Sequence, residues 1–355
     1  MTGARSALRE VTVDPVMACL VKIDYPPNRH VDGIGDPAQD SNVCLVPEPL
    51  VSVVMPTHNR PVWLAEAIGS VLAGHFTDLE VVVSNNGRPE HTRDLAARVS
   101  DARVRWLEQD PATGMLENFL TALGQARGRY IAVLHDDDRW APNMLTALVP
   151  PLLRRSDAVL SFADHFVMDA QGKVDLAATD RNSKRWGRAG LAQGYHQPFF
   201  ELAARQSVAI TGCVFRRDAL PPSAVTVVRG ACYDLWISYA LASTSGAAYY
   251  RDERLLYSRR HPGSVSRSGE LAGPGSAIAC HLRMLQDQRM GAYTGVLRRR
   301  LARDHLSAGA VLLRRGARRR AREHLTTSSR MHPSWKATAG LAASWLAPTA
   351  LLNRL

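Results

Sequence analysis

Between residues 50 and 142 the sequence alternates between short apolar runs and longer segments with helical periodicity. The apolar runs are rich in β-branched residues and fall at 50–55, 79–83, 104–107 and 130–134. Apolar residues recur at helical spacing over 61–71 and 116–123, and Pro142 stands where a further helix would begin. Strands that alternate with helices form βαβ units, so we predict an α/β fold with a mostly parallel sheet flanked by helices.

Polar segments follow three of these apolar runs, at 56–60, 84–87 and 135–138. In an open α/β sheet, ligands bind beyond the carboxyl ends of the parallel strands. The three segments are far apart in the sequence, but such a fold brings them together at one edge of the sheet. We therefore expect the functional site at this edge.

The segment after the fourth run contains Asp136, Asp137 and Asp138 in succession. Three adjacent carboxylates repel one another, and core packing does not require them. Their natural use is to bind a hard divalent cation, Mg²⁺ or Mn²⁺, which in turn neutralises a diphosphate. The alternative is a solvated acidic turn or a cap for the helix near Pro142. The position directly after a parallel strand favours the metal site.

Residues 155–269 are less regular. We expect a hairpin of 159–168 and 174–177, a strand over 208–216, a helix over 235–241, and short strands at 247–250 and 254–257. The last segment is predicted to be helical, with two helices between 297 and 325 separated near Gly316. This organisation gives an N-terminal extension at 1–48, an α/β domain at 49–269 and an Arg-rich helical C-terminal region at 270–355.

The formal charge of +11 comes from the last quarter of the chain. Residues 270–355 contain 15 Lys and Arg against 4 Asp and Glu, whereas the remaining residues contain 29 of each kind. The basic segment has two interpretations: a solvated helical face, which is slightly favoured, or a patch for anionic lipid headgroups near the apolar C-terminus. Nucleic-acid binding is not expected, because no recognition motif and no interleaved aromatic residues accompany the charge.

The composition narrows the class of protein further. No apolar run reaches the roughly 20 residues that a membrane-spanning helix needs, and the first residues lack the apolar segment of a secretory signal. The five cysteines are widely spaced without a Cys-x-x-Cys pair, which argues against a cysteine zinc site and indicates a reducing compartment. We expect a cytoplasmic protein, with peripheral contact at the inner face of the membrane as an option.

Three segments, in order, resemble family 2 glycosyltransferases. The segment 51–60 resembles the opening strand of that family, 114–118 and 126–142 resemble its glycine-to-DxD segment, and 257–266 resembles its closing motif. Together they cover roughly 50–265, the extent of a GT-A catalytic domain. The resemblance implies a GT-A fold, a nucleotide-diphosphate sugar donor, a divalent metal (Mn²⁺ or Mg²⁺) and inversion at the anomeric carbon. The implied acceptor is a hydroxyl of a glycan, a lipid-linked glycan or a natural product.

Position by position, the resemblance also implies site residues. It assigns the metal to Asp137, Asp138 and His261. It assigns donor contacts to the following positions: Pro56, Thr57, Asn59, Arg60, Asn85, Asn118, Asp136 and Arg260.

The chain departs from the family pattern at three of these segments. Asn85 and Asn86 stand where the family often has an acidic pair, so the identity of the nucleotide is open. His135 replaces the first acid of the usual Asp-x-Asp-Asp run, which shifts the metal to the acids that follow. Glu117 stands where Arg is common beside Asn118.

The segment that would supply the catalytic base departs from the family pattern. The stretch 229–236 matches a segment in which the family often carries Glu-Asp, but here Ala231 and Cys232 replace that pair. Asp234 is the one acid nearby and is the candidate base; its alternative role is to cap the helix at 235–241. Asp164 is the second candidate for the base.

Some neighbouring residues have two interpretations. Tyr233 and Trp236 are candidates to stack on an acceptor ring, or they belong to the core. Residues 212–214 line the acceptor pocket, or they form a plain buried strand.

Two other functions remain open at the level of the sequence. One is a non-catalytic module that binds a sugar nucleotide or a glycan, which the replaced acids keep possible. The other is a sugar-1-phosphate nucleotidyltransferase, against which the absence of glycine in the loop 56–60 counts.

Overall fold

The computed structural model describes residues 48–220, 232–263 and 274–346. The expectation for the N-terminal extension lies almost wholly outside these residues. So do Ala231 of the replaced acidic pair and the end of the closing motif at 264–266.

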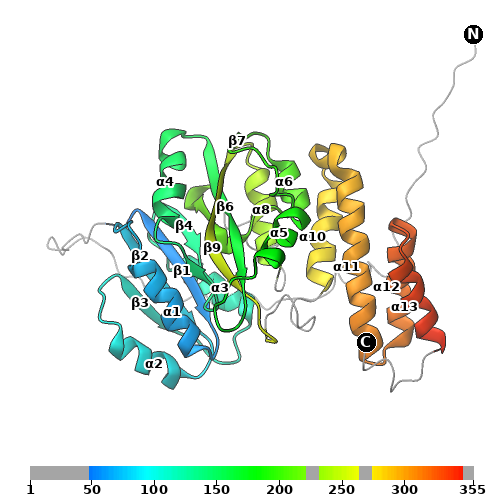
Figure 1. Ribbon diagram of the computed structural model, residues 1–355, viewed down its shortest axis with the longest axis horizontal. Coiled ribbons are helices and arrows are strands. Elements are labelled where there is room, and N and C mark those ends of the chain that lie inside the picture. The colour runs from blue at the N-terminus through cyan, green and yellow to red at the C-terminus, as the bar shows by residue number, and fades with distance from the viewer. Residues whose placement is uncertain (1–47, 221–231, 264–273, 347–355) are drawn as a thin grey trace, which may run out of the picture. The chain divides into compact units, whose positions relative to one another are not determined.

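The strands of the described residues form one nine-stranded sheet (Figure 1). In sheet order they run β3-β2-β1-β4-β8-β6-β9-β5, with β7 pairing to β9. Strands β3, β2, β1 and β4 are mutually parallel, β8 is antiparallel to both neighbours, and β6 and β9 are parallel. Their bounds are β1 (Val51–Thr57), β2 (Leu79–Asn85), β3 (Val104–Glu108), β4 (Tyr130–Val133), β5 (Arg139–Trp140), β6 (Ala158–Met168), β7 (Gly194–His196), β8 (Cys213–Arg216) and β9 (Ala247–Arg259). The predicted α/β fold with a mostly parallel sheet is confirmed.

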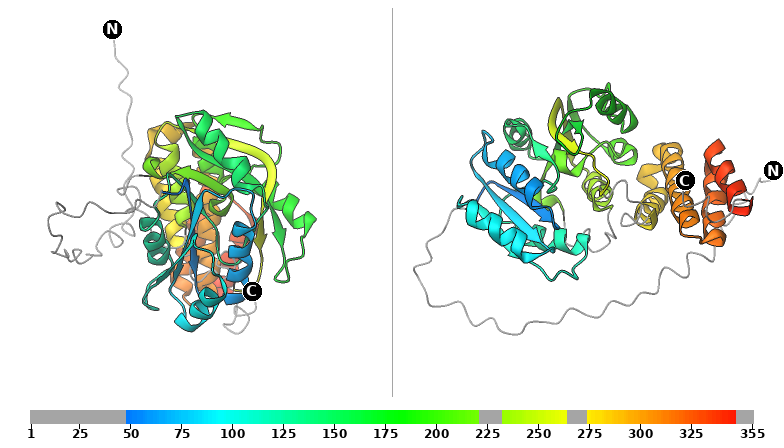
Figure 2. Two further views of the ribbon diagram at one scale, coloured as in Figure 1. Left: turned by 90° about the vertical axis from the view of Figure 1, so that its left-hand side faces the viewer. Right: turned by 60° about the horizontal axis from the view of Figure 1, so that its bottom comes forward.

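Helices cover both faces of this sheet (Figures 1 and 2). Helices α1 (Pro61–Leu72) and α4 (Met144–Arg154) pack on one face, and α3 (Met115–Gly124), α6 (Phe200–Arg205) and α8 (Tyr233–Ala242) pack on the other. All seven residues of β1 are buried, as expected for a central strand covered on both sides. The remaining helices are α2 (Pro89–Arg98), α5 (Leu176–Arg185), α10 (Pro274–Gln286), α11 (Thr294–Arg314), α12 (Arg318–Met331) and α13 (Trp335–Leu346).

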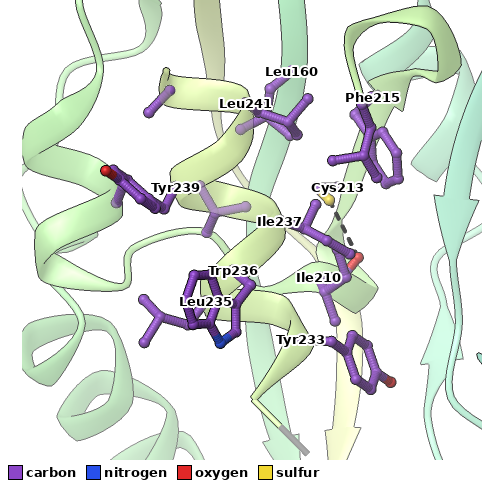
Figure 3. Packing of buried hydrophobic residues seen from close by; sticks show 14 of the residues in the cluster. Leu160, Ile210, Cys213, Phe215, Tyr233, Leu235, Trp236, Ile237, Tyr239 and Leu241 are labelled. Atoms are coloured by element: carbon purple, nitrogen blue, oxygen red, sulfur yellow. Dashed lines mark hydrogen bonds between the residues drawn. The ribbon is translucent and has the colours of Figure 1, made fainter. Parts of the chain in front are cut away.

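Helix α8 is fixed to the sheet by its apolar side chains (Figure 3). Leu235, Ile237 and Leu241 are buried in the same cluster as Leu160 of β6 and Phe215 of β8. This packing positions the first turn of α8, which carries Tyr233 and Asp234, beside the strand ends.

Three predictions for the second half of the sequence were wrong in detail. The hairpin fails because α5 begins at Leu176: the side chain of Asp175 accepts a hydrogen bond from the Ala178 N–H and caps the helix, and Val174 makes only an isolated bridge to Met168. The strand expected over 208–216 is β8 preceded by a 3₁₀ turn at 210–212. The two short strands expected at 247–257 are one strand, β9, whose pairing with β6 is irregular near Asp164.

The C-terminal helices α10 to α13 follow the residues that form the sheet (Figure 2). Helix α10 packs against α8, and α11 packs against α6 and α12. The predicted break near Gly316 is confirmed: Gly316 has φ +74° and lies between α11 and α12. No helix among the described residues is both long and apolar enough to cross a membrane.

A close backbone approach between the β4 segment and β1 generates a prediction. A Cβ atom at Gly128 would lie 2.5 Å from the backbone nitrogen of Ser52 and 2.7 Å from the carbonyl carbon of Val51. We expect Gly128→Ala to lower the free energy of unfolding by about 1–3 kcal/mol, because the strand pair must move apart.

Gly124 supplies the matched control, since a Cβ there has nothing within 4 Å. Gly124→Ala is expected to be neutral or stabilising by up to about 1 kcal/mol. Equilibrium denaturant unfolding measures both. A Gly128→Ala protein as stable as the wild type would show that the approach is not tight.

Candidate active site

The buried carboxylate of Asp136 joins the end of β1 to the end of β4. Its side chain is 5% exposed and accepts hydrogen bonds from the Thr57 hydroxyl (2.8 Å) and the His58 N–H (3.1 Å). The Arg60 guanidinium donates to its other oxygen at 2.9 Å. The predicted meeting of segments 56–60 and 135–138 is therefore observed. Both carboxylate oxygens of Asp136 accept hydrogen bonds from the protein.

Asp137 is the more open carboxylate and lies against the end of β9. Its Oδ2 atom is 3.0 Å from His261 Nε2 and 3.1 Å from Arg60 Nη1. The His261 ring packs on Trp63 of α1, with ring centroids 4.5 Å apart. Arg60 also donates to the Gly263 carbonyl at 3.1 Å. The structure thus brings together three of the residues expected from the sequence.

Asp138 fixes the strand that carries His261. Its buried Oδ1 atom accepts the Arg259 backbone N–H at 2.8 Å, and the Thr211 hydroxyl donates to the same carboxylate. The Arg259 side chain in turn donates to the Asp137 carbonyl at 2.9 Å. Burial raises the pKa of Asp136 and Asp138, and the neighbouring Asp137 charge raises both further.

His135 connects this loop to the first turn of α8. Its Nε2 atom is 2.6 Å from the Tyr233 hydroxyl, and the Tyr233 ring stacks on Phe119 at 4.3 Å. Asp234 follows Tyr233 on the exposed side of the turn. The surrounding protein partly desolvates the Asp234 carboxyl and raises its pKa, whereas the Leu235 backbone N–H and the nearby His135 act to lower it.

A cavity of about 450 Å³ opens beyond the ends of β1 and β2, and His58 in its wall donates its backbone N–H to Asp136 of the acidic loop 135–138. Asn59, which has φ +56°, accepts the Arg88 N–H at 2.7 Å and closes one wall. His58 and His91 also line the cavity, and the buried Nδ1 of His91 has no partner among the described residues. The size and polarity of this cavity suit a nucleoside.

Two of the expected donor residues are used as internal supports. The Asn118 amide donates towards the Ser84 and Thr57 carbonyls, and its oxygen accepts the Ser84 hydroxyl at 2.7 Å. The Asn85 oxygen accepts the Gly87 N–H, and its amide donates to Glu108. Both side chains are 2% exposed, so they shape the wall of the cavity from behind. Pro56 is likewise buried within β1.

The structure also places Asp164 and Arg260, two other residues expected at the site. Asp164 forms a buried ion pair with Arg188 at 2.6 Å. Burial acts to raise the pKa of Asp164, but the pairing with Arg188 outweighs it and keeps that pKa low. A low pKa disfavours Asp164 as the base. Arg260 is exposed, and its backbone N–H donates to the Met168 carbonyl. Burial, together with nearby cations that include Arg188 and Arg260, lowers the pKa of His165 to about 3.

The aromatic and strand residues proposed for the acceptor lie in the core. Tyr233 and Trp236 are buried in the cluster of Figure 3, and Cys213 belongs to the same cluster. Their alternative interpretation, as packing residues, is the one observed.

One group of described side chains has the geometry of a cation site. Single ligand atoms of His135, Asp137 and Asp138 all lie within 4.8 Å of one another. His261 contacts Asp137, so the available ligand atoms are carboxylate oxygens and imidazole nitrogens. The carboxylate oxygens suit both Mg²⁺ and Mn²⁺, and the imidazole nitrogens suit Mn²⁺ better than Mg²⁺. The sequence reasoning did not include His135 in this group and did not place His91 at the cavity. The place of His135 in the acidic run was the available signal, whereas His91 had none.

Comparison with known proteins places this site in a family. Residues 52–215 match the family model described as glycosyl transferase family 2. This match covers slightly less than half of the chain. The matched segment includes β1, β2, β4, the acidic loop and β8, and it ends before Asp234 and His261.

Individual relatives agree with this assignment. UDP-Glc:alpha-D-GlcNAc-diphosphoundecaprenol beta-1,3-glucosyltransferase WfgD of Escherichia coli is 33% identical over 107 residues, which are 30% of this chain and 42% of that protein. The chain thus spans less than half the length of this relative.

Solved structures share the fold. TarS 1-349 of S. aureus in complex with UDP-GlcNAc has a TM-score of 0.59 at 12% identity, over 86% of this chain and 90% of that one. The mannosyltransferase PcManGT from Pyrobaculum calidifontis, in complex with GDP-Man and Mn²⁺, has a TM-score of 0.52 at 16% identity, over 87% and 84%. The fold of this chain is therefore GT-A, as the sequence resemblance implied.

The position of Asn118 generates a prediction for the site. We expect Asn118→Ala to lower the free energy of unfolding by about 2–3 kcal/mol, because it leaves buried polar groups at the ends of β1 and β2 without partners. The adjacent Glu117 is exposed and is the matched control, with an expected cost for Glu117→Ala of at most about 1 kcal/mol. Urea unfolding compares the two. Equal stability of both variants would mean that Asn118 is not a structural support and is free to contact a donor.

Proposed function

We propose that this protein is a metal-dependent, inverting glycosyltransferase that moves a sugar from a nucleotide-diphosphate sugar to a hydroxyl acceptor. The observation that carries the proposal is the contact between Asp137 and His261 in the loop 135–138, which His58 links through Asp136 to a nucleoside-sized cavity. This arrangement offers a place for the base and ribose on one side and for the diphosphate on the other.

The donor would lie along the ends of β1, β2 and β4. The cavity beside His58 and Asn59 would hold the nucleoside, and His58 links it to the acidic loop through the hydrogen bond from its N–H to Asp136. Arg60 lies between Asp136 and Asp137, where its guanidinium can contact an anionic diphosphate. UDP and GDP are the nucleotides to test first, because the two structural neighbours are complexes with UDP-GlcNAc and GDP-Man.

The metal would be held by Asp137, His261 and His135, with Asp138 behind them. When bound, the cation would neutralise charge that develops on the departing nucleoside diphosphate. Asp136 and Asp138 contribute by holding β1 and β9 against the loop. Arg260, which is exposed and adjoins His261 in the sequence, is proposed to contact the diphosphate.

Asp234 is the proposed base. Its carboxylate is accessible to solvent, lies close to His135 and has a raised pKa, which suits a group that must accept a proton. It would take the proton of the acceptor hydroxyl as that oxygen bonds to the anomeric carbon. The bond from the anomeric carbon to the phosphate oxygen breaks on the opposite side, so the configuration inverts.

The acceptor class we favour is a lipid-linked glycan, because the name of the Escherichia coli relative states such an acceptor. The reaction would then take place at the cytoplasmic face of a membrane. We assign catalysis to residues 49–269 and a separate role to the C-terminal region 270–355, and we expect no nucleic-acid partner.

Two isosteric substitutions separate metal binding from base catalysis. Asp234→Asn is expected to lower kcat by about 10²–10⁴-fold while leaving the Mn²⁺-dependent thermal stabilisation by the nucleotide intact. Asp137→Asn is expected to abolish both turnover and that stabilisation. Asp94→Asn, at an exposed position of α2, is the matched control and should behave as wild type.

The pH dependence of turnover gives a second readout. Because the pKa of Asp234 is raised above its ordinary 3.8, protonation should reduce kcat as the pH falls through a value higher than 3.8. This acid limb should be absent from the residual activity of Asp234→Asn. Wild-type turnover by Asp234→Asn would contradict the assignment of the base. Nucleotide binding without any turnover would instead support the non-catalytic module.

A further inference from the structure

Helix α13 exposes an apolar stripe that the proposed catalytic site does not use. Trp335 is 76% exposed and Trp345 is 68% exposed, and both are among the most exposed large apolar side chains of the described residues. Ala339 and Ala342 lie between them and are also exposed. The spacings of four, three and three residues place all four on one face of the helix.

The opposite face of α13 is already occupied. Ala337 and Ser344 are buried, and Gly340 lies so close to Leu325 of α12 that a Cβ would approach its side chain to 3.1 Å. The helix therefore packs on α12 through small residues and directs its tryptophans outward. Packing within the described residues does not account for the tryptophan stripe.

A cation lies at each tryptophan. The Arg322 guanidinium of α12 is 3.9 Å from the centroid of the Trp345 ring, and it also donates to the Ser344 carbonyl at 3.3 Å. Lys336 Nζ is 5.7 Å from the centroid of the Trp335 ring. Such pairs present an apolar ring and a positive charge side by side.

The helices around the stripe are strongly basic. Residues 294–346 contain twelve Lys and Arg and two acids, Asp304 and Glu323. A merely solvated helical face explains the charge but not two exposed tryptophans on one helix. Tryptophan with lysine or arginine is the combination that binds the headgroup region of an anionic bilayer, where rings enter the interface and cations meet lipid phosphates.

We propose that the exposed face of α13 (Trp335, Ala339, Ala342 and Trp345), with Arg322 and Lys336, docks the protein on an anionic lipid bilayer. The proposal deepens the partner side of the proposed function but stands on separate residues. Docking would bring the catalytic half to the surface in which a lipid-linked acceptor resides. Transfer to a water-soluble acceptor does not require docking, so the two proposals can fail independently.

The direct test is co-sedimentation of the full chain with vesicles. Wild-type protein should bind vesicles that contain on the order of 30% phosphatidylglycerol and should bind pure phosphatidylcholine at least tenfold more weakly. Trp335→Ala combined with Trp345→Ala is expected to weaken binding to the anionic vesicles by about tenfold or more. Leu153→Ala combined with Leu176→Ala removes two exposed apolar side chains elsewhere and should leave binding unchanged.

A second pair of double variants tests the contribution of the positive charges to vesicle binding. Arg322→Gln combined with Lys336→Gln is expected to weaken binding by about five-fold for each charge removed, and the difference should shrink in high salt. Arg154→Gln combined with Arg181→Gln removes two exposed arginines from other helices and should have little effect. Circular dichroism melting of each variant verifies that α13 still folds.

Three results would overturn the docking proposal. The first is unchanged vesicle binding by the double tryptophan variant with intact melting. The second is a wild-type protein that binds neither vesicle or binds both equally. The third is self-association of the wild type in solution that the double tryptophan variant loses, without vesicle binding, since the stripe would then be an interface between copies.

Discussion

The structure depends first on one buried carboxylate, that of Asp136. Burying a charge is costly unless its hydrogen-bonding capacity is filled, and here the Thr57 hydroxyl, the His58 N–H and Arg60 fill it. All three donors belong to the segment after β1. The interaction therefore ties the end of β1 to the end of β4, and it fixes the loop in which the other two acids stand.

The other two acids of the loop, Asp137 and Asp138, have different contacts. Asp138 accepts the backbone N–H of Arg259 and so draws in the end of β9, 121 residues further along the chain. Because β9 ends there, His261 reaches Asp137, the acid that is left open. His135 continues the chain of contacts to Tyr233 and thus to the turn that carries Asp234. The proposed metal ligands and the proposed base are positioned by one connected set of hydrogen bonds.

Much of the first half could be predicted from the sequence, because β-branched runs and helical periodicity alternate there without interruption. The meeting of Thr57, Arg60 and Asp136 followed from the rule for strand ends. The roles of the individual acids could not be predicted, since they depend on partners such as Arg259 and His261 that lie far away in the sequence. The sequence predicted that Asn118 contacts the sugar donor, whereas its hydrogen bonds to Ser84 and Thr57 make it a structural residue between strand ends. The hairpin failed because the Asp175 cap outweighed the strand pattern that precedes α5.

The central claim is that Asp137 and His261 together hold a divalent cation beside a nucleoside diphosphate. Pulsed electron paramagnetic resonance of Mn²⁺ bound to the protein with UDP or GDP tests this most directly, because a coordinated imidazole nitrogen couples to the manganese electron spin. The account predicts nitrogen coupling in the wild type that is reduced in His261→Ala, and a reduced fraction of bound Mn²⁺ in Asp137→Asn. Bound Mn²⁺ with no nitrogen coupling, or with coupling unchanged in His261→Ala, would contradict it.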